Sequence, residues 1–162
     1  MGLEIAVYKK TKKFIGRIDI DADCDGQETP ISATGDELWN TTKLYINDDF
    51  ADHAGTLENG WYEFEDVESP DFNINYSAYS DWRQELADMA GFTGKKADPF
   101  YYIIWFSDCQ GVIGPEASAK LAQDFEAFDQ IASKKSPTFY RRYRTFADAF
   151  AYATDGGFVK FI

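Results

Sequence analysis

The segment Phe100–Phe125, FYYIIWFSDCQGVIGPEASAKLAQDF, contains an apolar run, a polar loop and the start of a helix. Residues 100–106 are aromatic or β-branched, which favours a fully buried strand, although periodicity alone does not separate so short a run from a buried helix. Polar residues follow at 107–110, and Gly114-Pro115 is typical of a helix start. Because loops held by rigid elements often carry binding residues, we expect this junction to form part of a site.

Capping residues and apolar spacing indicate three helices. Ser80 can cap a first helix that ends at Gly91. A second helix begins at Gly114 with an apolar stripe on one face, and a third begins at Ser136 and ends before Gly156. The residues expected on the buried faces are Trp82, Leu86, Met89, Leu121, Phe125, Phe128, Ile131, Phe139, Tyr143, Phe146, Phe150 and Ala153.

The remainder of the chain predicts strands and one long loop. Leu3, Ile5 and Val7 alternate with other residues, which is typical of a half-buried strand, and residues 14–20 can pair with it across a lysine-rich turn. Residues 21–40 contain few apolar side chains and are expected to form a loop. Further strand candidates are 44–46, 61–64, 72–76 and 158–162.

This order of elements predicts the fold class. Several strands, then helices, then one closing strand are typical of an α+β domain, and the strand–helix alternation of a doubly wound fold is missing. We expect residues 1–162 to form a single domain. Its mainly antiparallel sheet of N-terminal strands plus a C-terminal strand would pack against about three helices.

The net charge of −12 is regional. The segment Asp19–Glu68 holds fifteen acidic residues against one lysine, Lys43, for a net charge of −14. An acidic segment repels phosphate backbones, so we expect no nucleic-acid partner, whereas cations or a basic protein partner are favoured. A solvated acidic surface without a partner is the simpler interpretation.

The cysteines and the distribution of apolar residues indicate where in the cell the protein is expected. Cys24 and Cys109 do not make a disulfide framework, so the default is a reduced, intracellular protein. The N-terminus lacks the pattern of a signal peptide, and no apolar run reaches the roughly 20 residues that span a bilayer. We expect a cytoplasmic protein with no membrane partner, and the sequence leaves its oligomeric state open.

An acidic hexapeptide partly matches a calcium loop. Residues Asp21–Gly26, DADCDG, fit its first half, in which alternate carboxylates converge on one cation. The second half fails, because Glu28 stands at the apolar position and Ser32 at the position of the bidentate glutamate. We therefore expect a solvated turn and predict no metal site.

Catalytic patterns are weaker still. Cys109 beside Asp108 suggests a thiol nucleophile, but its base would have to be His53, the single histidine of the chain. An inert, packed thiol is the simpler interpretation. The chain contains no P-loop, GxGxxG, HExxH or GxSxG motif. We predict no catalytic residue and no cofactor.

Aromatic and basic residues together predict a ligand site. Tyr79, Trp82 and Arg83 share one face of a helix start, where they could stack a planar ring and pair with a phosphate. In the alternative interpretation, Trp82 lies in the core and Arg83 pairs with a surface carboxylate. The basic cluster 140–144 could serve the same anion or balance the acidic region within the fold. The predicted ligand-binding residues are Tyr76, Tyr79, Trp82, Arg83, Ser107, Asp108, Gln110 and Arg141.

Three segments resemble an uncharacterised family of small phage and bacterial proteins. The family pattern opens with M-G-L-D/E-I and contains segments like GSYSGYxxWRxxLA and FSDCEGxIGPxxxxKLxxDF. This chain has MGLEI at 1–5, YSAYSDWRQELA at 76–87 and FSDCQGVIGPEASAKLAQDF at 106–125. Ala78 and Gln110 replace a Gly and a Glu of the pattern, which argues against an acid or metal role at position 110. The resemblance implies a phage or prophage setting but no established activity.

By analogy with that setting, we expect a non-enzymatic accessory protein that sequesters a small anionic, nucleotide-like ligand and so acts against host defence. One alternative is an acidic protein, possibly a nucleic-acid mimic, that presents residues 19–68 to a basic host protein. An enzyme with an unrecognised site is a second alternative. A pocket containing both Trp82 and Asp108 would favour the ligand hypothesis, and a continuous acidic face without a pocket would favour the interaction hypothesis.

Overall fold

The computed structural model describes residues 2–162, and its central element is an antiparallel sheet of order β7-β1-β9-β8. The strands are β1 (Ile5–Lys9), β7 (Asp66–Glu68), β8 (Gly111–Ile113) and β9 (Phe158–Phe161). Ile5 and Val7 of β1 pack with the helices, while Ala6 and Tyr8 pack with a second sheet. The prediction of a half-buried first strand was wrong, because both of its faces are covered.

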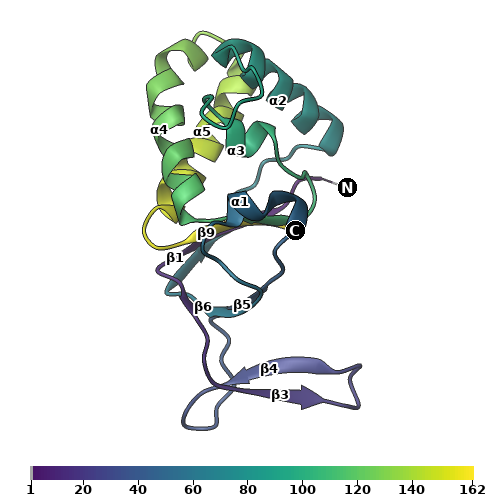
Figure 1. Cartoon of the computed structure of the whole chain (residues 1–162). Coiled ribbons are helices and arrows are strands. Elements are labelled where there is room, and N and C mark those ends of the chain that lie inside the picture. Colours follow the sequence, from purple (N-terminus) through teal and green to yellow (C-terminus); the bar gives the residue numbers. More distant parts are fainter. Residues whose placement is uncertain (1) are drawn as a thin grey trace.

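Three long helices cover one face of this sheet (Figure 1). They are α2 (Tyr76–Ala90), α4 (Pro115–Ala132) and α5 (Pro137–Ala153), and the short helices are η1 (Asp48–Phe50), α1 (Ala51–Ala54) and α3 (Tyr101–Ile104). Ser136 caps α5 as predicted. Asn75 caps α2 in place of Ser80, because its side chain accepts the N–H of Ala78 at 2.8 Å. The two caps satisfy backbone donors that would otherwise lack partners.

The buried helix faces largely follow the predicted spacing. Met89 and Phe128 are half-buried, and Ile131, in the last turn of α4, is exposed, so the predicted stripe is wrong at its end. The predicted residues that are buried are Trp82, Leu86, Leu121, Phe125, Phe139, Tyr143, Phe146, Phe150 and Ala153.

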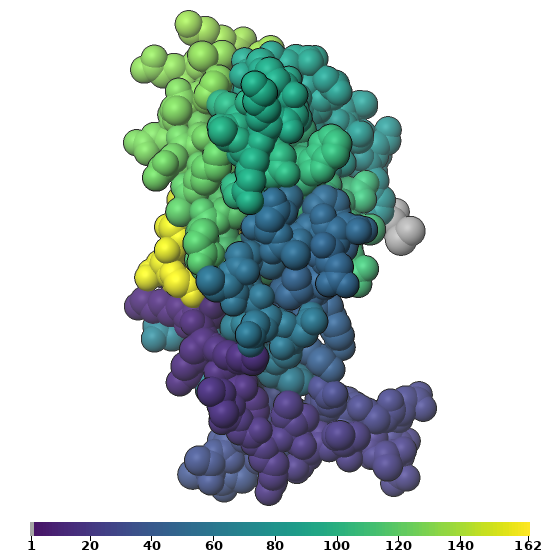
Figure 2. Space-filling view, in the orientation of Figure 1, coloured from purple at the N-terminus to yellow at the C-terminus, as the bar shows by residue number. Residues whose placement is uncertain are grey.

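A second sheet, of order β2-β6-β5, packs on the other face of the central sheet. It consists of β2 (Lys12–Lys13), β5 (Thr41–Leu44) and β6 (Gly60–Glu63). The apolar cluster between the two sheets contains Ala6, Tyr8, Leu44, Tyr62, Val112 and Phe158. Two further strands, β3 (Arg17–Asp21) and β4 (Gln27–Ile31), form a separate hairpin that extends away from the body (Figures 1 and 2).

Several strand predictions in the N-terminal half were wrong. Residues 14–20 do not pair with β1, because β7 and β9 occupy both edges of that strand. Instead, β3 pairs with β4, and β4 lies inside the segment 21–40 that was predicted to be a loop. Residues 72–76 form no strand. Phe72 and Ile74 are buried, but Asn75 makes only an isolated bridge with Gly2 before α2 begins.

The apolar run at 100–106 is not a strand either. Phe100 has a left-handed backbone, with φ of 62°, and its N–H donates to Asp124 Oδ2 at 2.9 Å. Lys120 donates to the same oxygen at 2.6 Å, which fixes the carboxylate. The chain turns at this anchor, forms α3 and leaves Trp105 exposed.

At the level of fold class, the α+β prediction is confirmed: the main sheet is antiparallel, it includes the C-terminal strand, and three long helices pack against it. Within residues 2–162, no helix is both long enough and apolar enough to cross a bilayer.

Candidate functional site

The two aromatic residues predicted to stack a ligand lie in the helical core. Tyr79 is 0% exposed and Trp82 is 2% exposed, and both rings pack against Phe146, with centroids 5.7 and 4.7 Å away. Burial raises the pKa of the Tyr79 hydroxyl well above its usual range. Trp82 Nε1 donates to the carbonyl oxygen of Phe139 at 3.3 Å. Neither ring is free to stack a ligand, so the core interpretation of Trp82 is the right one.

Arg83 lies at the surface end of this cluster and is half-buried. Its Nη1 donates to the carbonyl oxygen of Phe106 at 2.7 Å, and its guanidinium carbon lies 4.5 Å from the centroid of the Tyr79 ring. Across residues 2–162, no carboxylate lies within ion-pair distance of Arg83. The alternative prediction of a surface ion pair was therefore wrong, and the arginine is held by a carbonyl and an aromatic face.

The polar loop before β8 is shaped by Ser107. Its Oγ accepts the N–H groups of Cys109 and Gln110 at 3.3 and 3.2 Å. Asp108 is half-buried near Tyr79, and after burial its negative charge is a further cause of the raised pKa of that hydroxyl. Gln110 is exposed. The loop therefore places Asp108 close to the Tyr79–Arg83 pair, while Ser107 has mainly a structural role in the turn.

The thiol of Cys109 is exposed, so the prediction of a packed thiol was wrong. His53 is buried, and its Nδ1 lies 2.7 Å from Asp52 Oδ1. The hydrogen bonds of the described residues include none between Cys109 and His53. The geometry therefore gives no support to a cysteine–histidine pair.

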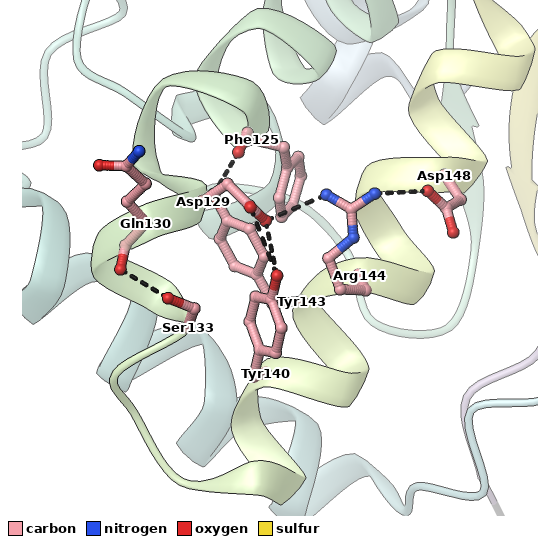
Figure 3. A network of polar contacts seen from close by, with 8 residues as sticks. All are labelled: Phe125, Asp129, Gln130, Ser133, Tyr140, Tyr143, Arg144 and Asp148. Carbon is pink, nitrogen blue, oxygen red and sulfur yellow. Dashed lines mark hydrogen bonds and ion pairs between the residues drawn. The ribbon is translucent and has the colours of Figure 1, made fainter.

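The basic cluster of α5 is partly neutralised within the helical layer. Arg144 bridges Asp129 and Asp148, with N–O distances of 3.0 and 3.1 Å, and Tyr140 donates to Asp129 at 3.1 Å (Figure 3). Arg144 thus balances acids of α4 and α5, and none of its ion pairs is with the acidic segment 19–68. Arg141 is exposed and does not line the groove that Arg83 forms with Gln84, Asp88 and Trp105.

Tyr76, the first residue of α2, is half-buried, and it does not line that groove either. Nor do Trp82 and Asp108. Of the eight predicted ligand-binding residues, Tyr79 contacts Arg83 and lies near Asp108. None of the five main pockets formed by residues 2–162 is lined by both Trp82 and Asp108, the arrangement that would favour the ligand hypothesis.

The β3–β4 hairpin belongs to a projecting arm, residues 15–39 (Figure 2). The arm leaves the body after Phe14, whose N–H donates to the carbonyl oxygen of Trp61 at 2.8 Å, and returns at Asn40, whose carbonyl accepts the N–H of Phe64 at 3.1 Å. Both attachment points therefore lie along β6 and its end. No strand in residues 2–162 pairs with the outer edge of β3, and the outer edge of β4 is met only by an isolated bridge between Ile31 and Glu37.

The arm combines acidic and apolar surface. It carries seven carboxylates against one cation, Arg17, for a net charge of −6. Ile15 is 93% exposed, Trp39 is 87% exposed and Ile20 is 68% exposed. Large exposed apolar side chains concentrated on one projection indicate an interaction surface.

Glu28 attaches the arm to the second sheet. Its Oε2 accepts hydrogen bonds from Lys43 Nζ at 2.7 Å and Trp61 Nε1 at 2.9 Å. The hydrogen bond from Lys43, followed by that from Trp61, lowers the pKa of Glu28. A cavity of about 510 Å³ lies at the base of the arm, where the apolar side chains of Ile15, Ile31 and Leu38 line it together with polar and charged residues.

The acidic hexapeptide forms the exposed turn of this hairpin. Asp21 Oδ1 accepts the N–H of Asp23 at 2.9 Å, and Asp25 has a left-handed backbone, with φ of 52°. The part of the chain that the structure describes contains no group of three His, Cys, Asp or Glu side chains placed to hold a metal ion. The solvated turn agrees with the prediction for this segment.

Sequence reasoning missed Trp39 and Trp105 as exposed aromatic residues. Trp105 was assigned to a buried strand, and Trp39 to the end of a loop. The alternation of Ile18 and Ile20 with charged residues did indicate a strand, but the sequence held no signal that this strand would leave the body.

Comparisons with models of protein families, with curated proteins and with solved structures find no match to this chain. The resemblance to a phage family therefore stays a prediction.

Proposed function

We propose that the protein is a non-enzymatic interaction protein that uses its arm to bind a basic protein partner. The observation that carries this proposal is the arm itself, an isolated acidic hairpin with exposed isoleucine and tryptophan side chains. A two-stranded hairpin is at best marginally stable alone in water, so a surface of this kind gains most from a partner that covers it.

The chemistry of the arm defines the partner. Its carboxylates would attract Lys and Arg side chains, speed association and suppress acidic partners. Its exposed apolar side chains and the cavity at its base would accept apolar side chains of the partner. Because a second arm carries the same net charge of −6, pairing between the arms of two copies is disfavoured.

The test compares three tagged variants as baits in a lysate of the cells that express the protein. The charge variant replaces Asp19, Asp21, Asp23 and Asp25 by Asn, which keeps the local turn because an Asn side chain can also accept the N–H of residue 23. The apolar variant is Ile15→Ser with Trp39→Ser. The matched control is Ile131→Ser, which changes an exposed isoleucine on the helical layer.

We expect quantitative mass spectrometry to identify a basic protein that the wild type and the control retain and that both arm variants lose. Binding of that purified protein should weaken as salt rises, because exposed charges are screened. Retention of the same proteins by all variants, or enrichment of acidic partners, would contradict the proposal. Light scattering of the purified protein separates this result from self-association.

A further inference from the structure

A groove of about 540 Å³ lies between α2 and the segment that follows α3. Its walls include Arg83, Gln84 and Asp88 from α2, and Trp105 from the end of α3. The arm contributes no residue to this groove, so the inference below is independent of the proposed function.

Arg83 brings a positive charge to the groove. Only its Nη1 is engaged in a hydrogen bond within residues 2–162, to the carbonyl of Phe106, and no carboxylate is paired with it. The Tyr79 ring and this carbonyl fix the guanidinium before any ligand arrives. A half-buried arginine with free donors is suited to a carboxylate or a phosphate, because charged hydrogen bonds to such groups are strong and directional.

Trp105 brings a flat aromatic face. It is 61% exposed, although tryptophan is usually highly buried. The turn at Phe100 and the short helix α3 place it at the groove, and its backbone N–H donates to the carbonyl of Tyr101 at 3.0 Å. The backbone under the indole is therefore fixed, while one side of the indole is available to stack a planar ring.

The groove also contains hydrogen-bond acceptors, in addition to the donors of Arg83. Gln84 Nε2 donates to Asp88 Oδ1 at 3.0 Å. Asp88 is five residues from Arg83, which is roughly 7.5 Å along the helix axis, so its charge lies away from the guanidinium. A ligand with an anion at one end and hydroxyl or amino donors at the other would match both ends of the groove.

We propose that this groove binds a nucleotide, that is, a planar ring carrying an anionic group and additional donors. The Trp105 indole stacks on the ring and Arg83 pairs with the phosphate. Asp88 accepts hydrogen bonds from donors of the sugar or the base, and the Gln84 amide can accept or donate them. Tyr79, which the sequence suggested as a stacking residue, instead positions Arg83.

The experiment is isothermal titration of the full-length protein with the four ribonucleoside 5′-monophosphates, with adenosine and with inorganic phosphate. We expect at least one monophosphate to saturate the protein. Relative to AMP, adenosine should bind about tenfold more weakly, because it lacks the anion, and phosphate alone should bind more weakly still, because it lacks the ring.

Two variants test the assigned residues. Trp105→Ala should weaken nucleotide binding about tenfold or more, and Arg83→Lys should weaken it while keeping the positive charge. Trp39→Ala and Arg141→Ala are the matched controls, since they remove an exposed tryptophan and an exposed arginine outside the groove, and both should bind as the wild type does.

Thermal melts establish that each variant is folded. If Arg83→Lys does not fold, Trp105→Ala still decides the matter, because its side chain is exposed. The proposal is overturned if no monophosphate saturates below about 5 mM. It is also overturned if adenosine binds as tightly as AMP, or if Trp105→Ala binds like the wild type.

Discussion

The helical layer and the arm use the same types of side chain in opposite environments. In the helical layer, Trp82 is 2% exposed and Phe146 is 0% exposed, whereas Trp39 of the arm is 87% exposed. The difference lies in the number of layers, because the helices pack against a sheet and against one another, while the arm has no third strand or helix of its own. Side-chain type alone therefore does not decide burial in this chain.

The largest expected contrast between the two regions is in tryptophan truncation. Trp82→Ala removes a ring packed between Phe139 and Phe146 and leaves a cavity, so it should lower the free energy of unfolding by about 3–5 kcal/mol. Trp39→Ala should change it by about 0.5 kcal/mol or less, because the side chain is exposed. Urea denaturation of both variants checks this, and equal losses would show that the arm is packed in solution.

A smaller contrast concerns two aspartates. Asp124 accepts hydrogen bonds from the N–H of Phe100 and from Lys120 Nζ. Asp124→Ala should cost about 1–3 kcal/mol, because it leaves the N–H of Phe100 unpaired and leaves Lys120 with only the carbonyl of Asp98. Asp23→Ala in the arm removes a carboxylate from an exposed turn and should cost about 0.5 kcal/mol or less. The same denaturation series measures both. A loss at Asp23 equal to that at Asp124 would mean that the acidic turn contributes to stability.

These residues also show which features of the fold could be predicted from the sequence. The helix starts at Gly114 and Ser136 and the apolar spacing along α5 were predictable, because they depend on residues within one or two turns. The turn at Phe100 was not predictable, because it depends on Asp124, 24 positions away along the chain.

The candidate site shows the same limit. Arg83 was identified from its local pattern, but its setting depends on the carbonyl of Phe106, 23 positions away, and on Trp105 lying outside the core. The projection of the arm depends on which strands occupy the edges of β1. Local spacing carries no information about such long-range pairing.

A third contrast concerns how the arm is held on the body as pH changes. The Glu28 contacts with Lys43 and Trp61 lower the pKa of Glu28 below its ordinary value of 4.5. The stabilisation of this attachment is therefore fully present above pH 4.5 and is lost as the pH falls through the lower pKa of the folded state. The indole N–H resonance of Trp61, followed by NMR, should shift with a midpoint below pH 4.5.

Glu28→Gln is the matched control for this titration. The amide cannot ionise, so the transition in the Trp61 signal should disappear, while the amides of β3 and β4 should exchange with solvent faster at neutral pH than in the wild type. A midpoint at or above pH 4.5 in the wild type would contradict the hydrogen bonds from Lys43 and Trp61. The signals of the helical layer should not change over the same transition.

Deletion of the whole arm should also have only a small effect on stability. Phe14 lies opposite Trp61 and Asn40 lies opposite Phe64, on the two sides of β6. Removing residues 15–39 therefore leaves a gap of two strand spacings across the sheet and three residues along it, about 14 Å in all. A five-residue Gly/Ser linker spans that gap, because an extended chain covers about 3.3 Å per residue. Since neither apolar cluster of the body includes a residue of the arm, we expect the deletion variant to melt within about 2–4 °C of the wild type, a shift equivalent to roughly 1 kcal/mol. The same variant should lose the basic partner and keep nucleotide binding at the Arg83 groove.

If the deletion instead unfolds the protein, the arm is part of the folding unit and its exposed side chains cannot be assigned to a partner alone.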